Sequence, residues 1–194
     1  MRDRPFYDTE ELRAAGFSSV GANVFVSRKA SLYGISGTIG DNVRIDDFTI
    51  LKGRIEIENH VHIASFCSVS GTRGQVRLKN CSTLANGVYI YTGSDDYRAV
   101  ALSSSTVPEE FLTTIAGDVT LASAVLIGAH SVILPGATIG EAASVGAFCI
   151  IHEQVARGAI VVAHGSTIVV KGYRDADAIL AMVRSLVAGR SNSS

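Results

Sequence analysis

The sequence predicts an all-β protein, a parallel β-helix of stacked six-residue units with a short helix near each end of the chain. Two features of the pattern support this: an aliphatic residue returns every six positions, and the residue four places after it is small or β-branched. The composition agrees, with 47% apolar and 18% charged residues. A chain of 194 residues with that balance can form one domain around a continuous core.

The six-residue period is the strongest signal. It matches neither the 3.6-residue period of a helix nor the alternation of a simple strand, but it suits a repeated strand and turn. The aliphatic positions are Val20, Val26 and Leu32; Ile39, Ile45, Leu51, Ile57, Ile63 and Val69; Leu78, Leu84 and Ile90; and Ile115, Leu121, Ile127, Ile133, Ile139, Val145 and Ile151. The positions four residues later are Val43, Thr49, Ile55, Val61 and Cys67, and then Val119, Val125, Ser131, Ala137, Ala143, Cys149 and Val155.

One such unit cannot bury its own aliphatic side chain. Stacked units about 4.8 Å apart bury it and satisfy each other's backbone groups. A β-sandwich with fortuitous spacing is the alternative, and the long unbroken series count against it. We therefore assign residues 18–172 to the β-helix, with an inserted loop at 92–114.

A short helix should precede the first coil, within residues 1–17. Asp8 and Glu11 have the spacing of a capping box, in which each side chain accepts a hydrogen bond from the backbone of the other residue.

A second helix should lie in residues 173–194, ending at Gly189, with residues 191–194 disordered. One helical face carries Ile179, Met182, Val183 and Leu186. We expect this helix to cover the open end of the β-helix, whose last coil would otherwise present an unpaired edge. A surface for a partner protein is the alternative.

Charge and cysteine usage exclude several classes of function. The net charge of −1 gives no reason to expect binding to nucleic acid or to an anionic membrane surface. Cys67, Cys81 and Cys149 are odd in number and lack CxxC spacing, which indicates buried thiols in a reducing compartment. The chain opens without a basic-then-apolar signal and has no apolar run of membrane-spanning length. We expect a cytoplasmic protein without membrane insertion.

The repeat is clearest in IGDNVRIDDFTI and VLIGAHSVILPGATIGEAASVGAFCII. With these segments, residues 18–170 resemble the hexapeptide-repeat acyltransferases, both the galactoside- and maltose-type O-acetyltransferases and the N-acetyltransferases of nucleotide-linked amino sugars. The resemblance implies a left-handed β-helix with three hexads per coil, and a homotrimer with active sites at subunit interfaces. It implies acetyl-CoA as acyl donor and no metal. The acceptor would be a nucleotide-linked amino sugar or a cell-envelope polysaccharide sugar, acylated on a hydroxyl or an amine.

The same resemblance suggests where coenzyme A binds. Ala129, Gly146 and Ala147 correspond to the small residues that line the groove for the pantetheine arm. Lys171 and Arg174 follow the last coil and are candidates to contact the CoA phosphates. Solvated surface positions are an equal alternative for these two cations.

The segment IYTGSDDYRAV, residues 90–100, interrupts the repeat where galactoside- and maltose-type enzymes carry their catalytic histidine. Hexad counting places Asp95 at that position, so the usual base is absent. We interpret Asp95 as catalytic. Ser94, Asp96 and Tyr97 would bind the acceptor, with the carboxylates on hydroxyl or amino groups and the ring on a sugar face.

Acyl transfer from a thioester still needs a base near the attacking group. His62 is the leading candidate, because it ends a hexad at a coil corner where its side chain can project into a cleft. We expect His62 of one chain to face Asp95 or Asp96 of the next, giving a carboxylate–imidazole pair. His130, near the expected thioester channel, is a weaker candidate.

Two other functions remain open. A γ-type carbonic anhydrase shares the β-helix but needs HxxxxH spacing for its metal, whereas His60 and His62 are two apart. A trimeric scaffold with a decayed active site would also lack the usual histidine.

Overall fold

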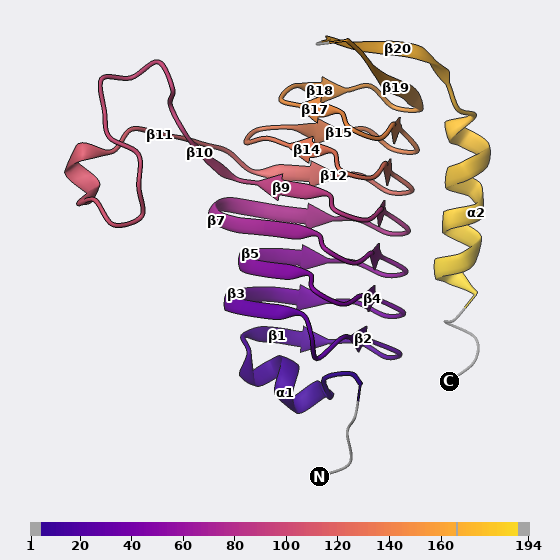
Figure 1. The fold of residues 1–194 in the computed structure, drawn as a ribbon. Helices are drawn as coiled ribbons and strands as arrows, with labels where there is room; N and C mark the ends of the chain where they lie inside the picture. Colours follow the sequence, from indigo (N-terminus) through magenta and orange to yellow (C-terminus); the bar gives the residue numbers. More distant parts are fainter. Residues whose placement is uncertain (1–4, 166, 190–194) are drawn as a thin grey trace.

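The computed structural model describes residues 5–165 and 167–189 and confirms a left-handed parallel β-helix with two helices (Figure 1). The lower coils combine a two-residue strand with a long strand that continues through one corner, most of the upper coils have short strands only, and the coils stack from the N-terminal helix upward. The predicted disorder of residues 191–194 falls outside the described residues.

Twenty strands, one 3-10 helix and two α-helices are found in the described part of the chain. Their bounds are α1 (Thr9–Ala14), β1 (Phe17–Val20), β2 (Phe25–Val26), β3 (Ser31–Ile39), β4 (Arg44–Ile45), β5 (Ile50–Ile57), β6 (His62–Ile63), β7 (Ser68–Leu78), β8 (Thr83–Leu84), β9 (Tyr89–Tyr91), β10 (Gly93–Asp95), η1 (Glu109–Phe111), β11 (Thr114–Ala116), β12 (Val119–Leu121), β13 (Leu126–Ile127), β14 (Val132–Ile133), β15 (Thr138–Ile139), β16 (Ser144–Val145), β17 (Ile150–Ile151), β18 (Gln154–Val155), β19 (Ala159–His164), β20 (Thr167–Tyr173) and α2 (Ala176–Ala188).

The coils are in parallel register, so residues about 18 positions apart lie above one another. In the eight-stranded sheet, Ile45 on β4 pairs with Ile63 on β6, which in turn pairs with Leu84 on β8. Each strand thereby donates and accepts hydrogen bonds with the coils on either side, which satisfies its backbone groups.

The predicted core is confirmed from Ile39 onward with one exception, while Val20 and Leu32 are only partly buried and pack against it. From Ile39 onward the aliphatic six-residue positions are buried, and so are all twelve positions four residues later. Ile115 differs, because it lies on β11 and is 44% exposed. The prediction that the coils resume at Ile115 is therefore wrong. β11 pairs with β10 of the loop, and the stack resumes at β12.

Two of the three corners repeat tightly. The helix-side corner and the aromatic corner each place one residue per coil at positive φ, directly above its counterpart. These positions are Asn42, His60, Cys81, Ala124 and Ala142 at the helix-side corner, and Phe48, Phe66, Gly87, His130 and Phe148 at the aromatic corner.

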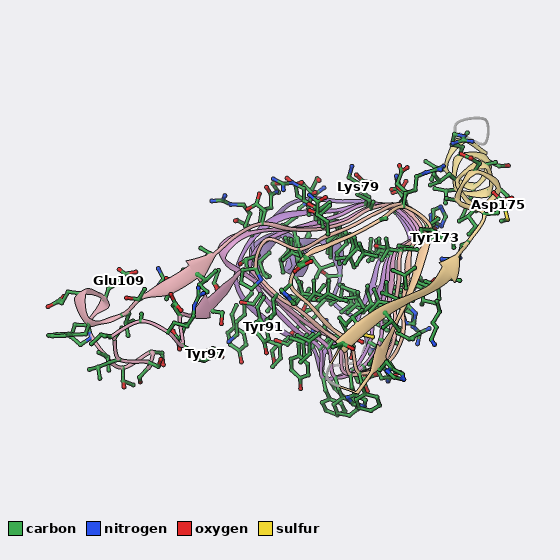
Figure 2. The ribbon with its side chains drawn as sticks, turned by 90° about the horizontal axis from the view of Figure 1, so that it is seen from above. Lys79, Tyr91, Tyr97, Glu109, Tyr173 and Asp175 are labelled. Carbon is green, nitrogen blue, oxygen red and sulfur yellow. The ribbon has the colours of Figure 1, made fainter. Side chains whose placement is uncertain are left out.

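The third corner, which we call the loop corner, is irregular. The pairing register shifts there between Tyr33 and Ser36 and again between Gly53 and Arg54. One coil higher, the excursion from Thr92 to Asp118 leaves the stack (Figure 1). Viewed from above, this loop projects from one corner of the triangle, and α2 lies at another (Figure 2).

Both predicted helices are present. At α1, Asp8 and Glu11 form the predicted capping box. At α2, Asp175 accepts a hydrogen bond from the backbone of Ala178, and Gly189 follows the last helical residue.

The prediction that α2 covers the open end of the β-helix is wrong. The helix runs down the side of the stack, where Asp177 pairs with Arg157 at the helix-side corner (Figure 1). The antiparallel β20 extends over the top coil instead. Among the described residues, no helix has the length and apolar character needed to cross a membrane.

Candidate active site

Thr92 fixes the start of the loop to the body of the β-helix. Its buried hydroxyl donates to the carbonyl of Ser70 at 2.9 Å and accepts from the backbone N–H of Arg73 at 3.2 Å. The N–H of Gly117 donates to the Thr92 carbonyl at 3.0 Å. The chain therefore leaves and rejoins the stack at nearly one point, and the β10–β11 hairpin rises from there.

Asp95, at the end of β10, lines a cleft of about 290 Å³ at the base of this loop, which we call the acidic cleft. Its other polar walls are Thr72 and Arg73 from the body, and Ser94, Ser104, Ser105 and Thr114 from the loop. The Asp95 side chain is half-buried, and within residues 5–165 and 167–189 it has no hydrogen-bond or ion-pair partner. A half-buried carboxylate without a partner can accept a hydrogen bond or a proton from a bound ligand.

The neighbouring predicted residues lie differently. Ser94 lines the acidic cleft together with Asp95. Asp96 accepts hydrogen bonds from the backbone and side chain of Arg98, which closes a local turn. Tyr97 is 91% exposed and lies on the loop, outside the β-helix body (Figure 2). Within one chain, therefore, Ser94 and Asp95 share a cleft, whereas Asp96 is engaged by Arg98 and Tyr97 faces solvent.

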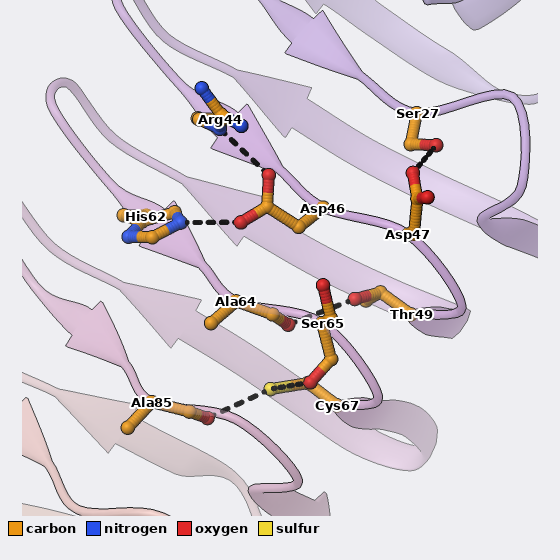
Figure 3. Close-up of polar contacts among 10 residues, drawn as sticks. All are labelled: Ser27, Arg44, Asp46, Asp47, Thr49, His62, Ala64, Ser65, Cys67 and Ala85. Atoms are coloured by element: carbon orange, nitrogen blue, oxygen red, sulfur yellow. Dashed lines mark hydrogen bonds and ion pairs between the residues drawn. The ribbon is translucent and has the colours of Figure 1, made fainter. Parts of the chain in front are cut away.

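His62 already has a carboxylate partner in its own chain (Figure 3). Its Nε2 lies 2.9 Å from Oδ2 of Asp46, and Nε of Arg44 donates to the other carboxylate oxygen at 2.7 Å. Partial burial alone would raise the pKa of Asp46, but the hydrogen bonds from His62 and Arg44 together outweigh it, so this pKa lies below its ordinary value. The ionised carboxylate orients the imidazole ring, as a positioned base requires.

His62 and Asp95 do not meet within one chain. His62 lies on β6 of the eight-stranded sheet, and Asp46 begins the turn at the aromatic corner. Asp95 lies on the hairpin that leaves from the loop corner (Figure 1). A site that uses both residues must therefore combine two chains.

Three of the predicted coenzyme A residues do come together. Ala129 and Ala147 are on successive coils of the aromatic corner, where the N–H of Phe148 donates to the Ala129 carbonyl at 2.9 Å. Gly146 adjoins them, and beside this small-residue surface the His130 and Phe148 rings stack at 5.3 Å. The result is a strip without bulky side chains, bordered by two rings, on the same side of the stack as His62.

Lys171 and Arg174 have different surroundings. Lys171 is exposed on β20, in the bulge between the residues that pair with Ile160 and Val161. Arg174 is half-buried, and its Nη1 donates to the carbonyl of Ala142 at 3.0 Å and to Oγ of Ser144 at 3.1 Å. It thereby ties the start of the helical segment to the helix-side corner. For both residues, contact with CoA phosphates stays a prediction.

Sequence reasoning missed two features. Asp46, the partner of His62, could have been found from the 18-residue coil, since Arg44 and His62 are in register and Asp46 is two residues further on. The protrusion that contains Arg73 did leave a signal, because the six-residue spacing lengthens to nine between Val69 and Leu78, where the coil gains three residues. The described residues contain no group of three His, Cys, Asp or Glu side chains able to hold a metal.

Comparisons with known proteins bear on the chemistry. No family model matches the chain. The dTDP-4-amino-4,6-dideoxy-D-glucose acyltransferase of Escherichia coli is 36% identical over 153 residues, which is 77% of this chain and 79% of that protein.

Solved structures extend the similarity over nearly the whole chain. AntD, an N-acyltransferase from Bacillus cereus solved with dTDP and 3-hydroxybutyryl-CoA, is 34% identical, with a TM-score of 0.87, and the match covers 97% of this chain and 100% of that one. A variant of AntD solved with dTDP-4-amino-4,6-dideoxyglucose and coenzyme A has a TM-score of 0.85 at 34% identity, covering 96% of this chain and 100% of that one.

Proposed function

The chain belongs to the hexapeptide-repeat acyltransferases, and from that premise we propose that it acylates the amino group of a dTDP-linked 4-amino sugar, with an acyl-coenzyme A as donor. In this reaction the amine attacks the thioester carbonyl, a C–N bond forms and the C–S bond breaks. The amine loses a proton to a base, and the thiol of coenzyme A leaves.

The unpaired carboxylate of Asp95 carries the proposal. An amino sugar is protonated near neutral pH and must be held and deprotonated before it can attack. A half-buried carboxylate without an internal partner suits this task, and the acidic cleft is otherwise lined largely by hydroxyl groups that suit a sugar. We assign Ser94 to the sugar hydroxyls. Asp96 and Tyr97 remain candidates to contact the acceptor once a second chain covers the loop.

We place the complete site between two chains of a homotrimer. Each chain presents the loop with Asp95 at one corner, and the His62–Asp46 pair with the Ala129–Ala147 strip on the opposite side. The aromatic corner is suited to burial by a neighbour, because Phe48 and Phe66 stack at 5.1 Å while remaining 51% and 59% exposed. In this arrangement the loop of one chain reaches His62 of the next.

Coenzyme A would lie along the aromatic corner. Ala129, Gly146 and Ala147 leave room for the pantetheine arm to approach backbone groups, and Lys171 on β20 is exposed for a phosphate. Cys67, Cys81 and Cys149 are all free thiols, which fits a cytoplasmic reaction.

Acyl transfer can be tested directly with acetyl-CoA and dTDP-4-amino-4,6-dideoxyglucose. We expect release of free thiol and a product heavier by one acetyl group. The matched control is the dTDP sugar with a hydroxyl in place of the amine, which should release thiol at the background rate. If the hydroxyl sugar is acylated and the amino sugar is not, the proposed reaction would be O-acylation instead of amine acylation. Turnover of neither, by protein that binds acetyl-CoA, would overturn the proposal.

A further inference from the structure

A second and larger cleft adjoins the acidic cleft at the loop corner. It has a volume of about 690 Å³, within the range of roughly 300–1,000 Å³ that is usual for small-molecule sites. Its walls come from three successive coils, through β3, β5 and β7, and we call it the basic cleft.

Glycines form much of the floor of the basic cleft. Gly53 and Gly71 are paired across neighbouring coils, and a Cβ on Gly71 would lie 2.1 Å from the carbonyl oxygen of Arg54. Gly34 has open space where its Cβ would lie. Gly71 is therefore required for the close approach of the two coils, whereas the backbone at Gly34 is open to a ligand without an intervening side chain.

The side chains that line the basic cleft are strongly cationic. Lys52, Arg54 and Arg73 all face it, and no carboxylate is among its lining residues. Arg73 pairs with Glu109 of the loop at 2.6 Å. Lys52 and Arg54 form no ion pair within 4 Å among the described residues, although the charge of Arg54 helps to lower the pKa of the nearby Asp118. Two cationic side chains without a direct partner therefore lie in one concave surface.

Tyr33 adds an aromatic wall. Its ring is 56% exposed, and Nζ of Lys52 lies 5.6 Å from the ring centroid. An exposed ring beside two cations combines a surface for a planar base with charges for phosphate groups.

The basic and acidic clefts share Thr72 and Arg73, which protrude between them. One ligand can therefore lie across both. Its anionic part would meet Lys52 and Arg54, and its cationic amine would meet Asp95.

We infer that the basic cleft binds the diphosphate of a nucleoside-diphosphate sugar and so directs the amino sugar into the acidic cleft. This inference rests on the proposed function and assigns the recognition of its acceptor to Lys52, Arg54 and Tyr33. Arg73, held by Glu109, would link occupancy of the basic cleft to the position of the loop.

Equilibrium binding of dTDP, measured by calorimetry, tests the assignment without requiring turnover. Lys52→Met and Arg54→Met should each weaken dTDP binding roughly tenfold or more, because each removes a charge-assisted contact to phosphate. Thymidine, which lacks phosphate, should bind wild type and variants equally. Lys79→Met is the matched control, since Lys79 is exposed at a distance from the loop (Figure 2) and should leave dTDP binding unchanged.

Acetyl-CoA binding and the thermal unfolding midpoint verify that each variant is folded. Unchanged dTDP affinity in both Lys52→Met and Arg54→Met would overturn the inference while leaving amine acylation intact. Wild-type protein that binds no dTDP would also overturn it. The proposed function fails independently of this inference if wild-type protein binds dTDP but releases no thiol from acetyl-CoA.

Discussion

The aromatic corner and the loop corner are built from the same coils but behave in opposite ways. At the aromatic corner each coil turns tightly, and one residue per coil stacks at positive φ above the last, from Phe48 to Phe148. At the loop corner the register shifts, extra residues protrude and the chain departs altogether between Thr92 and Asp118.

The difference between the two corners shows where a periodic fold can accommodate the irregular residues of a binding site. A tight corner is constrained by the coils above and below, so a change in its length would disturb the stacked positions. At the loop corner, additional residues point outward and disturb no buried aliphatic. The basic and acidic clefts lie at this irregular corner, whereas the proposed coenzyme A strip lies at the regular one.

The largest effect should come from the loop corner. Asp95→Asn removes the unpaired carboxylate and should lower the rate of acyl transfer about 10³-fold, within the range for loss of a general base. Acetyl-CoA affinity should stay within about twofold, because Asp95 lies away from the aromatic corner. Rate and affinity are measured by thiol release and calorimetry.

Glu110→Gln is the control for Asp95→Asn, since Glu110 is an exposed carboxylate on the same loop. It should keep the wild-type rate. A collapse of acetyl-CoA affinity in Asp95→Asn would mean that the loop belongs to the donor end of the site.

Stability should separate the stack from the loop. Leu84 is fully buried between coils, and Leu84→Ala should lower the free energy of unfolding by about 3 kcal/mol through lost burial and a residual cavity. Leu102 on the loop is 56% exposed, and Leu102→Ala should change it by less than about 0.5 kcal/mol. Urea denaturation measures both, and equal effects would show that the loop folds as part of the core.

His62→Ala tests whether the two sides of the stack combine across chains. We expect a rate about 50-fold lower, since the positioned imidazole is lost. Coexpression of His62→Ala with Asp95→Asn chains should restore part of the activity, because mixed trimers contain some sites with both residues intact. No restoration in isolated mixed trimers would place His62 and Asp95 in separate functions.

The smallest effect concerns acid stability. The pKa of Asp46 is below its ordinary value of 3.8 in the folded chain, so its ion-pair contribution is fully present above that pH and is lost as the pH falls through the lowered pKa. The difference in unfolding free energy between wild type and Asp46→Asn should therefore shrink as the pH falls from 6 to 3. A difference that stays constant with pH would show that packing, not charge, carries the effect.

Much of the fold could be predicted from the sequence because the same positions of each six-residue unit are buried in every coil. Each residue of the Ile39–Val69 series is buried for the same reason, and the Asp8–Glu11 capping box is a local signal that needs no tertiary context. The position of α2 could not be predicted in this way. The helix packs through Ala176 and Leu180, which are buried, whereas Met182 and Leu186 of the predicted apolar face are 63% and 49% exposed. The pair of Arg157 with Asp177 is exposed and adds little to this packing.

The site was less accessible to sequence reasoning. Counting hexads predicts Asp95 as a site residue, since the interruption falls at a fixed place in the repeat, and its catalytic role stays a prediction. The basic cleft was not identified, because Lys52 and Arg54 look like ordinary exposed charges until the glycines at the corner open the surface beside them. Its charges come from two coils, with Lys52 and Arg54 on β5 and Arg73 on β7, and they follow no repeated spacing.

The hydrogen bond from Gly117 to the Thr92 carbonyl and the adjoining β10–β11 pairing close the base of the loop and make the loop a separable part of the molecule. Because closing a longer loop adds only about 0.6 kcal/mol for each doubling of its length, excursions of many lengths can start and end at this point. The segment that we propose binds the acceptor could then be exchanged between β-helices while the proposed donor strip stays in place. A graft that ends at Thr92 and Gly117 would be the natural unit for redirecting such an enzyme to another amino sugar.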